Sequence, residues 1–424
     1  MFVYLDNSAT TKQYEAVTAE MLKYMKHDFG NPSSLHGLGI EAEKAVKAAR
    51  VSAAAALGVL TEEVYFTSGG TESDNAAVYG ALTARKRTGK KIITSAVEHP
   101  AMIEACRRAE NEGFEVVYLD VDDRGIIDMA QLESEMDDEV VFVSVMHVNN
   151  ETGTVQPIEM IGSLKDAFNK KRRRNKTGMI LHTDAVQSFC KLRCVSGLKN
   201  AGVDMISVSS HKVHGPKGVG ALYIRGSINV SPFIVGGGQE KNMRSGTENV
   251  PGIAGFGKAV DLCMKGTTDG DGAAVQGLDE VTGKMSKCRA FLLEGIRSEI
   301  KDVKVNSPEN VKTEGATDTA GEVRCCPSIL NISFLGTRGE VILHTLEERG
   351  IYVSTGSACS SNKKGRSHVL SAMGLSDKEI ESAVRFSFSG DETVEQMEYV
   401  LSELKTAVER FRRLGSVLDR KSVV

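Results

Sequence analysis

Residues 207–220 read Ser-Val-Ser-Ser-His-Lys-Val-His-Gly-Pro-Lys-Gly-Val-Gly, and they continue an apolar run that begins at Met205. Lys212 therefore stands at a strand end, after small hydroxyl residues and before a turn of glycine and proline. A lysine in this position is expected to be partly desolvated, which lowers the pKa of its amine and lets it hold a carbonyl as a Schiff base. A surface lysine on a hairpin is the alternative that the stretch leaves open.

Short apolar runs on both sides of this stretch alternate with helical patterns. The run over Val140–Val145 is apolar without alternation, which is typical of a strand buried on both faces of a mostly parallel sheet. Helical patterns over Glu41–Ala56, Ser73–Arg87 and Ala101–Glu112 lie between such runs, so the sequence predicts an α/β domain with crossover helices. The expected strands are Val64–Thr67, Lys91–Thr94, Glu115–Leu119, Val140–Val145, Met179–His182, Met205–Ser209 and Gly220–Ile224.

The length of 424 residues and the composition indicate more than one globular domain. Hydrophobic residues make up 41% and charged residues 25%, which excludes a mostly disordered chain, a coiled coil and a collagen-like chain. Gly266–Gly283 is expected to be a flexible connection, and the polar stretch Asn306–Gly321 precedes an apolar strand at Ile329–Phe334. A final amphipathic helix runs from Met397 to Leu414. We expect an N-terminal segment (1–14) packed on either domain, a large domain (15–260) and a smaller α+β domain (261–424).

Charge and cysteine content narrow the functional class. The net charge of −4, from 52 basic and 56 acidic residues, creates no strong field for nucleic acid or an anionic membrane. The N-terminus lacks the pattern of a signal peptide and no apolar run reaches ~18 residues, so neither export nor a membrane span is expected. The eight cysteines are therefore expected to be reduced thiols in the cytoplasm.

Three groups of residues leave alternatives open. Cys190 and Cys194 are ordinary thiols or, less favoured, zinc ligands. Cys325 and Cys326 are ordinary thiols, or a redox pair or sulfur relay. The basic run over residues 170–174, with Lys176, is a solvated helix end or a docking site for an acidic partner or tRNA.

Two further segments place polar residues at expected strand ends. His182-Thr-Asp-Ala-Val-Gln187 carries Asp184, a carboxylate that would pair with a pyridinium nitrogen or would instead cap the next helix. Phe66-Thr-Ser-Gly-Gly-Thr-Glu-Ser-Asp-Asn75 joins a strand to a helix, so its N–H groups would hold a phosphate or form a simple tight turn. It matches neither of the common glycine-rich nucleotide patterns. Together with Lys212, the two segments predict a pyridoxal phosphate site.

With these segments the chain resembles the class V aminotransferase family of fold-type I enzymes, and within it the cysteine desulfurases of the NifS/IscS type. The resemblance implies an aspartate aminotransferase-like fold, with a mostly parallel seven-stranded sheet in the large domain and a smaller α+β domain. It also implies a homodimer that holds pyridoxal phosphate. It is carried by Tyr4-Leu-Asp-Asn-Ser-Ala-Thr-Thr11, Phe29-Gly-Asn-Pro-Ser-Ser34, Glu98-His-Pro100, His147-Val-Asn-Asn-Glu-Thr-Gly153, Met243-Arg-Ser-Gly-Thr-Glu-Asn249 and Ser354-Thr-Gly-Ser-Ala-Cys-Ser360.

The resemblance also implies a role for individual residues. Lys212 would carry the cofactor, Asp184 would face the pyridine nitrogen, and Gln187 would hydrogen-bond the ring hydroxyl. His99 would stack on the ring and move protons. Asn150 would bind both cofactor and substrate, and Arg385 would hold the substrate carboxylate, which suits its two-pronged side chain. The implied phosphate ligands are Gly70, Thr71, Ser209, His211 and a Thr247 lent by the neighbouring subunit.

Cys359 distinguishes a desulfurase from an ordinary aminotransferase, since transamination needs no protein thiol. Its segment, about 354–368, is rich in small and polar residues, so it is expected to be mobile. The resemblance implies that Cys359 takes sulfur from L-cysteine as a persulfide and leaves L-alanine. The length of the segment matches the long-loop group that donates sulfur to a scaffold.

The expected acceptor is an Fe–S scaffold or a tRNA-thiolation enzyme, and no direct contact with nucleic acid or membrane is expected. No intrinsic metal site is expected, although Cys359 would be able to ligate a nascent Fe–S cluster transiently. The alternatives are another class V enzyme, such as a selenocysteine lyase or an aminotransferase, and a non-catalytic sulfur carrier or scaffold.

Overall fold

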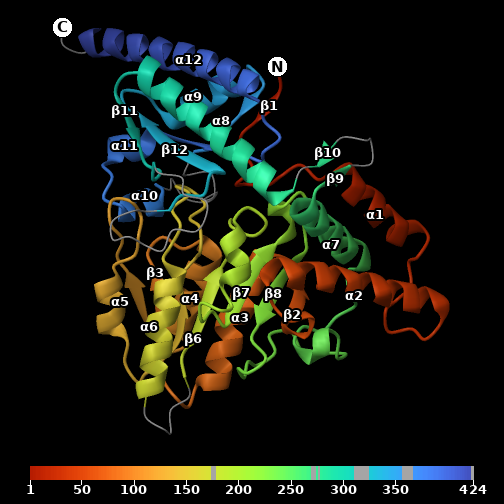
Figure 1. The fold of residues 1–424 in the computed structure, drawn as a ribbon. Coiled ribbons are helices and arrows are strands. Elements are labelled where there is room, and N and C mark those ends of the chain that lie inside the picture. Colours follow the sequence, from red (N-terminus) through yellow and green to blue (C-terminus); the bar gives the residue numbers. More distant parts are fainter. Residues whose placement is uncertain (173–177, 269–273, 276, 310–323, 356–365, 422–424) are drawn as a thin grey trace.

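A seven-stranded sheet forms the centre of the larger part of the molecule in the computed structural model (Figure 1), which describes residues 1–172, 178–268, 274–275, 277–309, 324–355 and 366–421. Strand β8 runs antiparallel to its neighbours β2 and β7, and the other neighbours pair in parallel. The predicted α/β fold with a mostly parallel sheet of seven strands is confirmed. In spatial order the strands are β2 (Val64–Thr67), β8 (Gly220–Ile224), β7 (Met205–Ser209), β6 (Ile180–Asp184), β5 (Val140–Ser144), β3 (Lys91–Ser95) and β4 (Glu115–Leu119).

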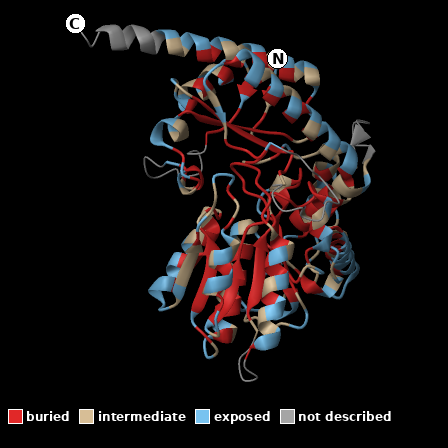
Figure 2. Cartoon of the chain, turned by 60° about the vertical axis from the view of Figure 1, so that its left-hand side comes forward, coloured by how far each residue is buried: buried red, intermediate tan, exposed pale blue. Residues whose placement is uncertain are grey.

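The five inner strands are buried along their whole length, which explains why their sequences lack alternation. Figure 2 shows these strands in red, with exposed residues on the outer sides of the helices. Phe142 and its neighbours pack against two helices on one face, whereas Val143 faces the helices on the other. The helices on the Phe142 face are α3 (Gly70–Arg85) and α4 (Pro100–Asn111). The helices on the Val143 face are α2 (Gly37–Leu57), α5 (Met129–Glu135), α6 (Ile158–Lys171) and α7 (Val250–Lys265).

Of the seven strands expected for this sheet, four match the structure residue for residue, namely β2, β4, β7 and β8. The largest difference is at β6, which extends two residues beyond the expected end, because Asp184 still pairs with Ser207 of β7. Among the described residues, none of the helices combines the length and apolar character needed to cross a bilayer.

A second core lies at the other end of the molecule, at the top of Figure 1. It packs an antiparallel three-stranded sheet against long helices, with Leu292, Phe386 and Leu404 at its centre. The elements here are β11 (Val303–Val305), β12 (Ile329–Phe334), β14 (Ala383–Ser387), α8 (Leu278–Glu299), α9 (Gly339–Glu347), α10 (His368–Ala372), α11 (Asp377–Glu381) and α12 (Val394–Lys421).

The N-terminal residues contact both cores. Strand β1 (Val3–Tyr4) pairs in parallel with β13 (Ile351–Tyr352), and Leu5 is buried in the second core. The chain then crosses to the sheet, where the backbone N–H of Thr11 donates to the carbonyl of His211 at 3.0 Å. Helix α1 (Glu15–Lys26) follows, packed against α7. The first eleven residues therefore pass between the two cores, over the carboxyl edge of the sheet.

The expectation of a flexible connection over Gly266–Gly283 is wrong for its last part. Helix α8 begins at Leu278, because Leu278 and Met285 are buried on one side of it and Gly283 lies on the exposed side. Before it, β9 (Thr267–Thr268) pairs antiparallel with β10 (Ala274–Val275). Residues 310–321 of the polar stretch Asn306–Gly321 lie outside the described residues.

We predict that Gly220→Ala destabilises the fold by roughly 2 kcal/mol, because a methyl group there overpacks the sheet edge. A Cβ at Gly220 would lie 2.6 Å from the carbonyl oxygen of Val208 and 2.7 Å from Cα of Gly69. Both are backbone atoms that cannot rotate away. Urea unfolding followed by circular dichroism measures the loss.

The matched control is Gly283→Ala, in α8, where a Cβ meets nothing within 4 Å. It should stabilise the protein by about 0.5–1 kcal/mol, since alanine favours a helix over glycine. Equal stabilities of the two variants would contradict the tight contact at Gly220.

Candidate functional site

The expected site residues follow strands whose carboxyl ends lie along one edge of the sheet, where ligands bind in open α/β sheets. His99 follows β3, Asp184 ends β6, and Lys212 follows β7. Gly70 begins the helix that follows β2, at the same edge. The fold therefore brings four segments that are distant in sequence to one place.

Lys212 is half-buried and its ammonium is held by the N-terminal segment. Its Nζ donates to the carbonyl oxygens of Ser8 and Ala9, the latter at 2.6 Å. The Ser8 carbonyl also accepts a hydrogen bond of 3.0 Å from Nε2 of Gln187. Although β7 and β8 do form an antiparallel pair around Lys212, its side chain points into the molecule and not to the surface.

Asp184 is 5% exposed at the end of β6. Burial raises the pKa of its carboxyl to about 6, against the opposing effects of the Val186 N–H and the Lys212 ammonium. Its Oδ1 accepts a hydrogen bond of 2.8 Å from the N–H of Val186, so it caps a turn and not the helix considered from the sequence. At neutral pH the carboxyl is ionised, and it lies near the positive charge of Lys212.

His99 is the N-terminal cap of α4, where its Nδ1 accepts a hydrogen bond of 3.1 Å from the N–H of Ala101. Burial, then the charges of Lys212 and His368, lower its pKa to about 4. The imidazole is therefore neutral at pH 7. Because Nδ1 accepts, Nε2 carries the proton and is the atom able to donate.

Two buried groups beside these residues have no role in the sequence-based prediction. Glu98 accepts hydrogen bonds from Oγ of Ser95 (2.6 Å) and from the N–H of Met146 (2.8 Å), and burial raises its pKa to about 8. His182 lies between Oγ of Ser144 (2.8 Å) and Oγ of Ser207 (2.9 Å), and burial lowers its pKa to about 3. Both groups are therefore neutral at pH 7. In the sequence, these two residues are marked only by their neighbours, since Glu98 directly precedes His99 and His182 stands two residues before Asp184.

A turn of two glycines lies where β2 meets α3. Gly69 has φ of +151°, and the first N–H groups of the helix, from Gly70 on, have no partner within it. A Cβ at Gly70 would lie 2.9 Å from Cγ2 of Val186, so the turn requires glycine. Ser209 lies beside Gly69, with its Oγ 3.9 Å from the place a Cβ on Gly69 would occupy. Such a turn fits a phosphate, which the helix N-terminus favours.

Two other expected phosphate ligands, Thr71 and His211, differ in solvent exposure. Thr71 is exposed on the first turn of α3. His211 is half-buried, and its Nδ1 lies 3.2 Å from Oγ1 of Thr10. Burial, then the neighbouring positive charges beginning with Lys212, lower the pKa of His211 to about 4.

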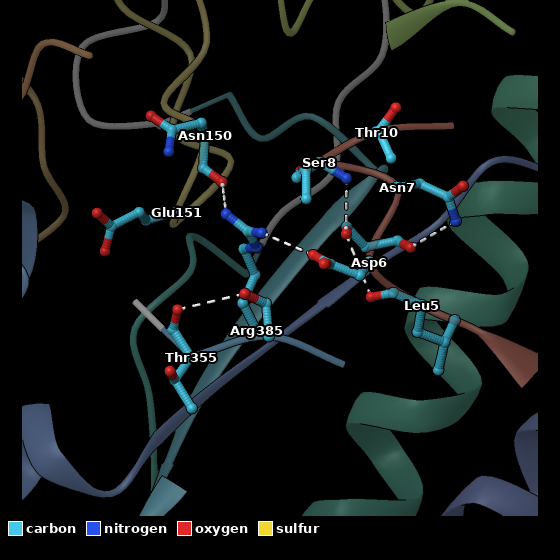
Figure 3. Close-up of polar contacts among 12 residues, drawn as sticks. Leu5, Asp6, Asn7, Ser8, Thr10, Asn150, Glu151, Thr355 and Arg385 are labelled. Atoms are coloured by element: carbon cyan, nitrogen blue, oxygen red, sulfur yellow. Dashed lines mark hydrogen bonds and ion pairs between the residues drawn. The ribbon is translucent and has the colours of Figure 1, made fainter. Parts of the chain in front are cut away.

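Arg385 is 2% exposed in β14, and two of its nitrogens are held (Figure 3). Its Nη2 donates to Oδ1 of Asp6 at 2.8 Å, and its Nη1 donates to the carbonyl of Asn150 at 3.0 Å. Its Nε has no hydrogen-bond partner among the described residues. Asn149 fixes the turn that presents Asn150, because its Oδ1 accepts the N–H of Glu151 at 2.9 Å. Arg385 is therefore buried, unlike the surface ion pair that the sequence alone left open.

Thr247 is not brought into this group within the chain, and Cys359 lies outside the described residues. Thr247 is exposed before α7, and its side chain makes no hydrogen bond within the described part of the chain. Cys359 and the segment 356–365 lie outside the described residues. The residues that flank this segment do reach the site: Oγ of Ser367 donates to Glu151 at 2.5 Å, and Nε2 of His368 lies 2.9 Å from the Glu98 carbonyl.

The remaining sequence-based candidates are cysteines and the basic run. Cys325 and Cys326 are fully buried free thiols, and burial raises the pKa of Cys325 to about 12, which favours the interpretation as ordinary thiols. Cys190 and Cys194 are also free thiols, and within the described ranges no three His, Cys, Asp or Glu side chains are grouped to hold a metal ion. Arg172 is buried and donates to the Val140 carbonyl at 2.8 Å, while residues 173–177 are outside the described part.

Comparison with known proteins is consistent across sequence and structure. The family model described as aminotransferase class-V matches residues 3–400. The chain is 38% identical to "Cysteine desulfurase IscS" of Clostridium botulinum, over 98% of this chain and 97% of that protein. It is 39% identical to "Cysteine desulfurase 1" of Trichormus variabilis, over 97% and 94%.

Two solved structures are similar over most of the chain. One is titled "NIFS-LIKE PROTEIN" and has a TM-score of 0.83 and 34% identity, over 96% of this chain and 100% of that one. The other, "SspA in complex with cysteine", has a TM-score of 0.74 and 33% identity, over 92% and 100%.

The buried Glu98 carboxyl should make stability depend on pH in a defined window. Its folded-state pKa of about 8 lies above the ordinary value of 4.5 for a glutamate, so its contribution to stability is complete below about pH 4.5 and is lost as the pH rises through about 8. Each unit of such a shift corresponds to about 1.4 kcal/mol. Unfolding of the wild type and Glu98→Gln between pH 4 and 9 should show the variant gaining relative stability across this window.

Glu104→Gln is the matched control, since it removes one exposed carboxylate from the helix that follows Glu98. A stability difference between Glu98→Gln and wild type that stays constant from pH 4 to 9 would show that folding does not shift the pKa of Glu98.

Proposed function

The chain belongs to the class-V aminotransferase family, and from this premise we propose that it is a pyridoxal-phosphate-dependent cysteine desulfurase. It converts L-cysteine into L-alanine and takes the sulfur onto Cys359 as a persulfide, for Fe–S cluster assembly or tRNA thiolation. The observation that carries the proposal is the arrangement of Lys212, Asp184 and His99 at one edge of the sheet. The names of the relatives and the cysteine in one structure's title support the substrate.

The chemistry of the site fits pyridoxal phosphate. Gly70, Thr71, Ser209 and His211, with Thr247 of the partner subunit, would hold the phosphate. The ionised carboxyl of Asp184 would pair with the ring nitrogen, and the amide of Gln187 would donate to the ring oxygen. When bound, the cofactor supplies an electron sink for the carbon atoms of the substrate.

Lys212 and His99 would handle the protons of the reaction. The two carbonyls that hold the Lys212 ammonium keep it near Asp184 and His99. Once the amine is released as a free base, it would accept the proton from Cα of the substrate. The neutral imidazole of His99, with its proton on Nε2, would lie against the ring and donate where a proton is needed.

Arg385 and Asn150 would bind the carboxylate of L-cysteine. The guanidinium suits a carboxylate because two N–H groups can bond both oxygens. Asp6 now holds one of these nitrogens at 2.8 Å, so the substrate carboxylate would compete with or replace that contact. Burial of Arg385 strengthens the interaction, because little water surrounds it.

Cys359 would accept the sulfur without any outside oxidant. Its thiolate attacks Sγ of the substrate, an S–S bond forms, and the C–S bond breaks. The electron pair of that bond stays on carbon, where protonation completes alanine, and Cys359 keeps the sulfur as a persulfide. Support comes from the flanking residues: Ser354 pairs with Arg385, and His368 contacts the Glu98 carbonyl. Cys359 is four residues from Thr355, a reach of roughly 14 Å when extended.

The partners follow from this chemistry. The persulfide would pass to an Fe–S scaffold or a tRNA-thiolation enzyme, and Cys359 would transiently ligate a nascent cluster during transfer. The site is completed in a homodimer by Thr247 of the partner subunit. The free thiols of the described cysteines suit the cytoplasm, which is where we place the reaction.

We predict that Cys359→Ala loses sulfide and persulfide formation but keeps the visible absorbance of the bound cofactor. Sulfide release from L-cysteine with a reductant, together with a persulfide-specific alkylation assay, measures the effect. Cys288→Ala is the control, because Cys288 is buried in the second core and makes its contact with the Glu392 carbonyl. Unchanged turnover in Cys359→Ala would contradict the proposal and favour the aminotransferase alternative.

We also predict that Arg385→Lys raises KM for L-cysteine about tenfold or more, because one charge-assisted hydrogen bond to the carboxylate is lost. Steady-state kinetics measure it, and the cofactor absorbance should be unchanged. Arg412→Lys, on α12, is the matched control, since this arginine donates only to the carbonyls of the second core in the described part. An unchanged KM would remove Arg385 from the substrate site.

A further inference from the structure

Lys191 is a buried lysine that neither the resemblance nor the reaction described above uses. It is 6% exposed, and its Nζ lies 3.3 Å from Oε1 of Gln187. Among the described residues no carboxylate pairs with it. It follows Cys190, whose φ of +53° is in the left-handed region. A buried ammonium without an acid partner and a left-handed cysteine both cost stability, and such costs are typical of functional positions.

The titratable groups that act on Lys191 come from several elements. Cys190 belongs to its own turn, Cys263 to α7, and Arg385 to β14, while Cys326 precedes β12. Burial lowers the pKa of Lys191; the thiols oppose this effect and Arg385 adds to it. A cavity of about 20 Å³, with room for about one water molecule, is lined by Lys191, Lys212, His214, Cys190 and Cys263.

The orientation of the Gln187 amide is determined chemically by its two neighbours. An ammonium group can only donate, so the atom of Gln187 that faces Lys191 must be the amide oxygen. The carbonyl of Ser8 can only accept, so the atom that faces it, at 3.0 Å, must be the amide nitrogen. Both constraints give the same orientation. One N–H of the amide then points to Ser8, and the second remains available to a ligand.

We propose that Lys191 is a positioning residue: by holding Oε1 of Gln187, it keeps the amide N–H groups directed at the Ser8 carbonyl and at the ring oxygen of the cofactor. The inference rests on the proposed function, because the contact of Gln187 with the ring belongs to it. Without Lys191, only the Ser8 carbonyl holds the amide of Gln187 in this orientation, so the amide is positioned less firmly.

The test replaces Lys191 by methionine, which keeps the unbranched chain but removes the charge and the donor. In the holoenzyme, the pH midpoint of the visible absorption band should rise by about one unit, because loss of a charge-assisted interaction favours the protonated cofactor. We expect kcat to fall about tenfold with a smaller change in KM for L-cysteine. The melting temperature should stay the same or rise, since a buried unpaired charge is removed.

Three further variants separate positioning from structure. Lys191→Arg keeps the charge and the donors, and should restore the midpoint to within about 0.3 units of wild type. Lys199→Met is the matched control, since Lys199 pairs with Glu63 at 2.7 Å, on the same connection between β6 and β7. In a Gln187→Ala background, Lys191→Met should shift the midpoint much less than in wild type, because Lys191 acts through Gln187.

The outcomes are distinct. A wild-type band with an unchanged midpoint in Lys191→Met overturns this inference and leaves the proposed function standing. A melting temperature lowered by more than about 5 °C in Lys191→Met also overturns it, because Lys191 is then structural. If the wild type forms no visible band with added pyridoxal phosphate, the proposed function fails, and this inference fails with it.

Discussion

The contact between the Lys212 ammonium and the carbonyls of Ser8 and Ala9 is the interaction that joins the parts of this molecule at its site. Lys212 belongs to the sheet, whereas the N-terminal residues begin in the second core, where Leu5 is buried. The same carbonyl of Ser8 receives the amide of Gln187. Removing this crossing segment would take two acceptors from a half-buried cation and would remove contacts between the two cores at the point where the ligand is expected.

The electrostatics of the site follow from burial. Helices cover both faces of the sheet, so its polar groups gather at the carboxyl edge. Burial shifts the pKa values of most of these groups in the direction that favours the neutral form. His99 and His182 are neutral because their pKa values fall to about 4 and 3, and Glu98 is protonated because its pKa rises to about 8. Against this neutral background the charges of Lys212 and Asp184 have little competition and interact strongly at short range.

The sequence predicted those features that depend on neighbouring residues, and it missed those that depend on contacts between residues far apart in the chain. Strands β2, β4, β7 and β8 were predicted to the residue because each is a short run rich in apolar and β-branched or aromatic residues that is bounded by residues of a different pattern, a signal carried by the local sequence. The end of β6 was missed because Asp184 is polar and stays in the strand through its pairing with Ser207, 23 residues away. The start of α8 was missed because glycine, threonine and aspartate favour a loop locally, whereas Leu278 and Met285 are held in the helix by the cores.

The sequence by itself determined the chemical groups and their order: the glycine turn at 69–70, the aspartate at 184, the lysine at 212 and the thiol at 359. These are recognisable because each is a local pattern at a strand end or in a small polar segment. Only the tertiary structure decided that Asp6 and Asn150 hold Arg385, that burial raises the pKa of Glu98, and that Lys191 contacts Gln187. These properties depend on burial and on contacts that folding creates, and no local pattern in the chain encodes either one.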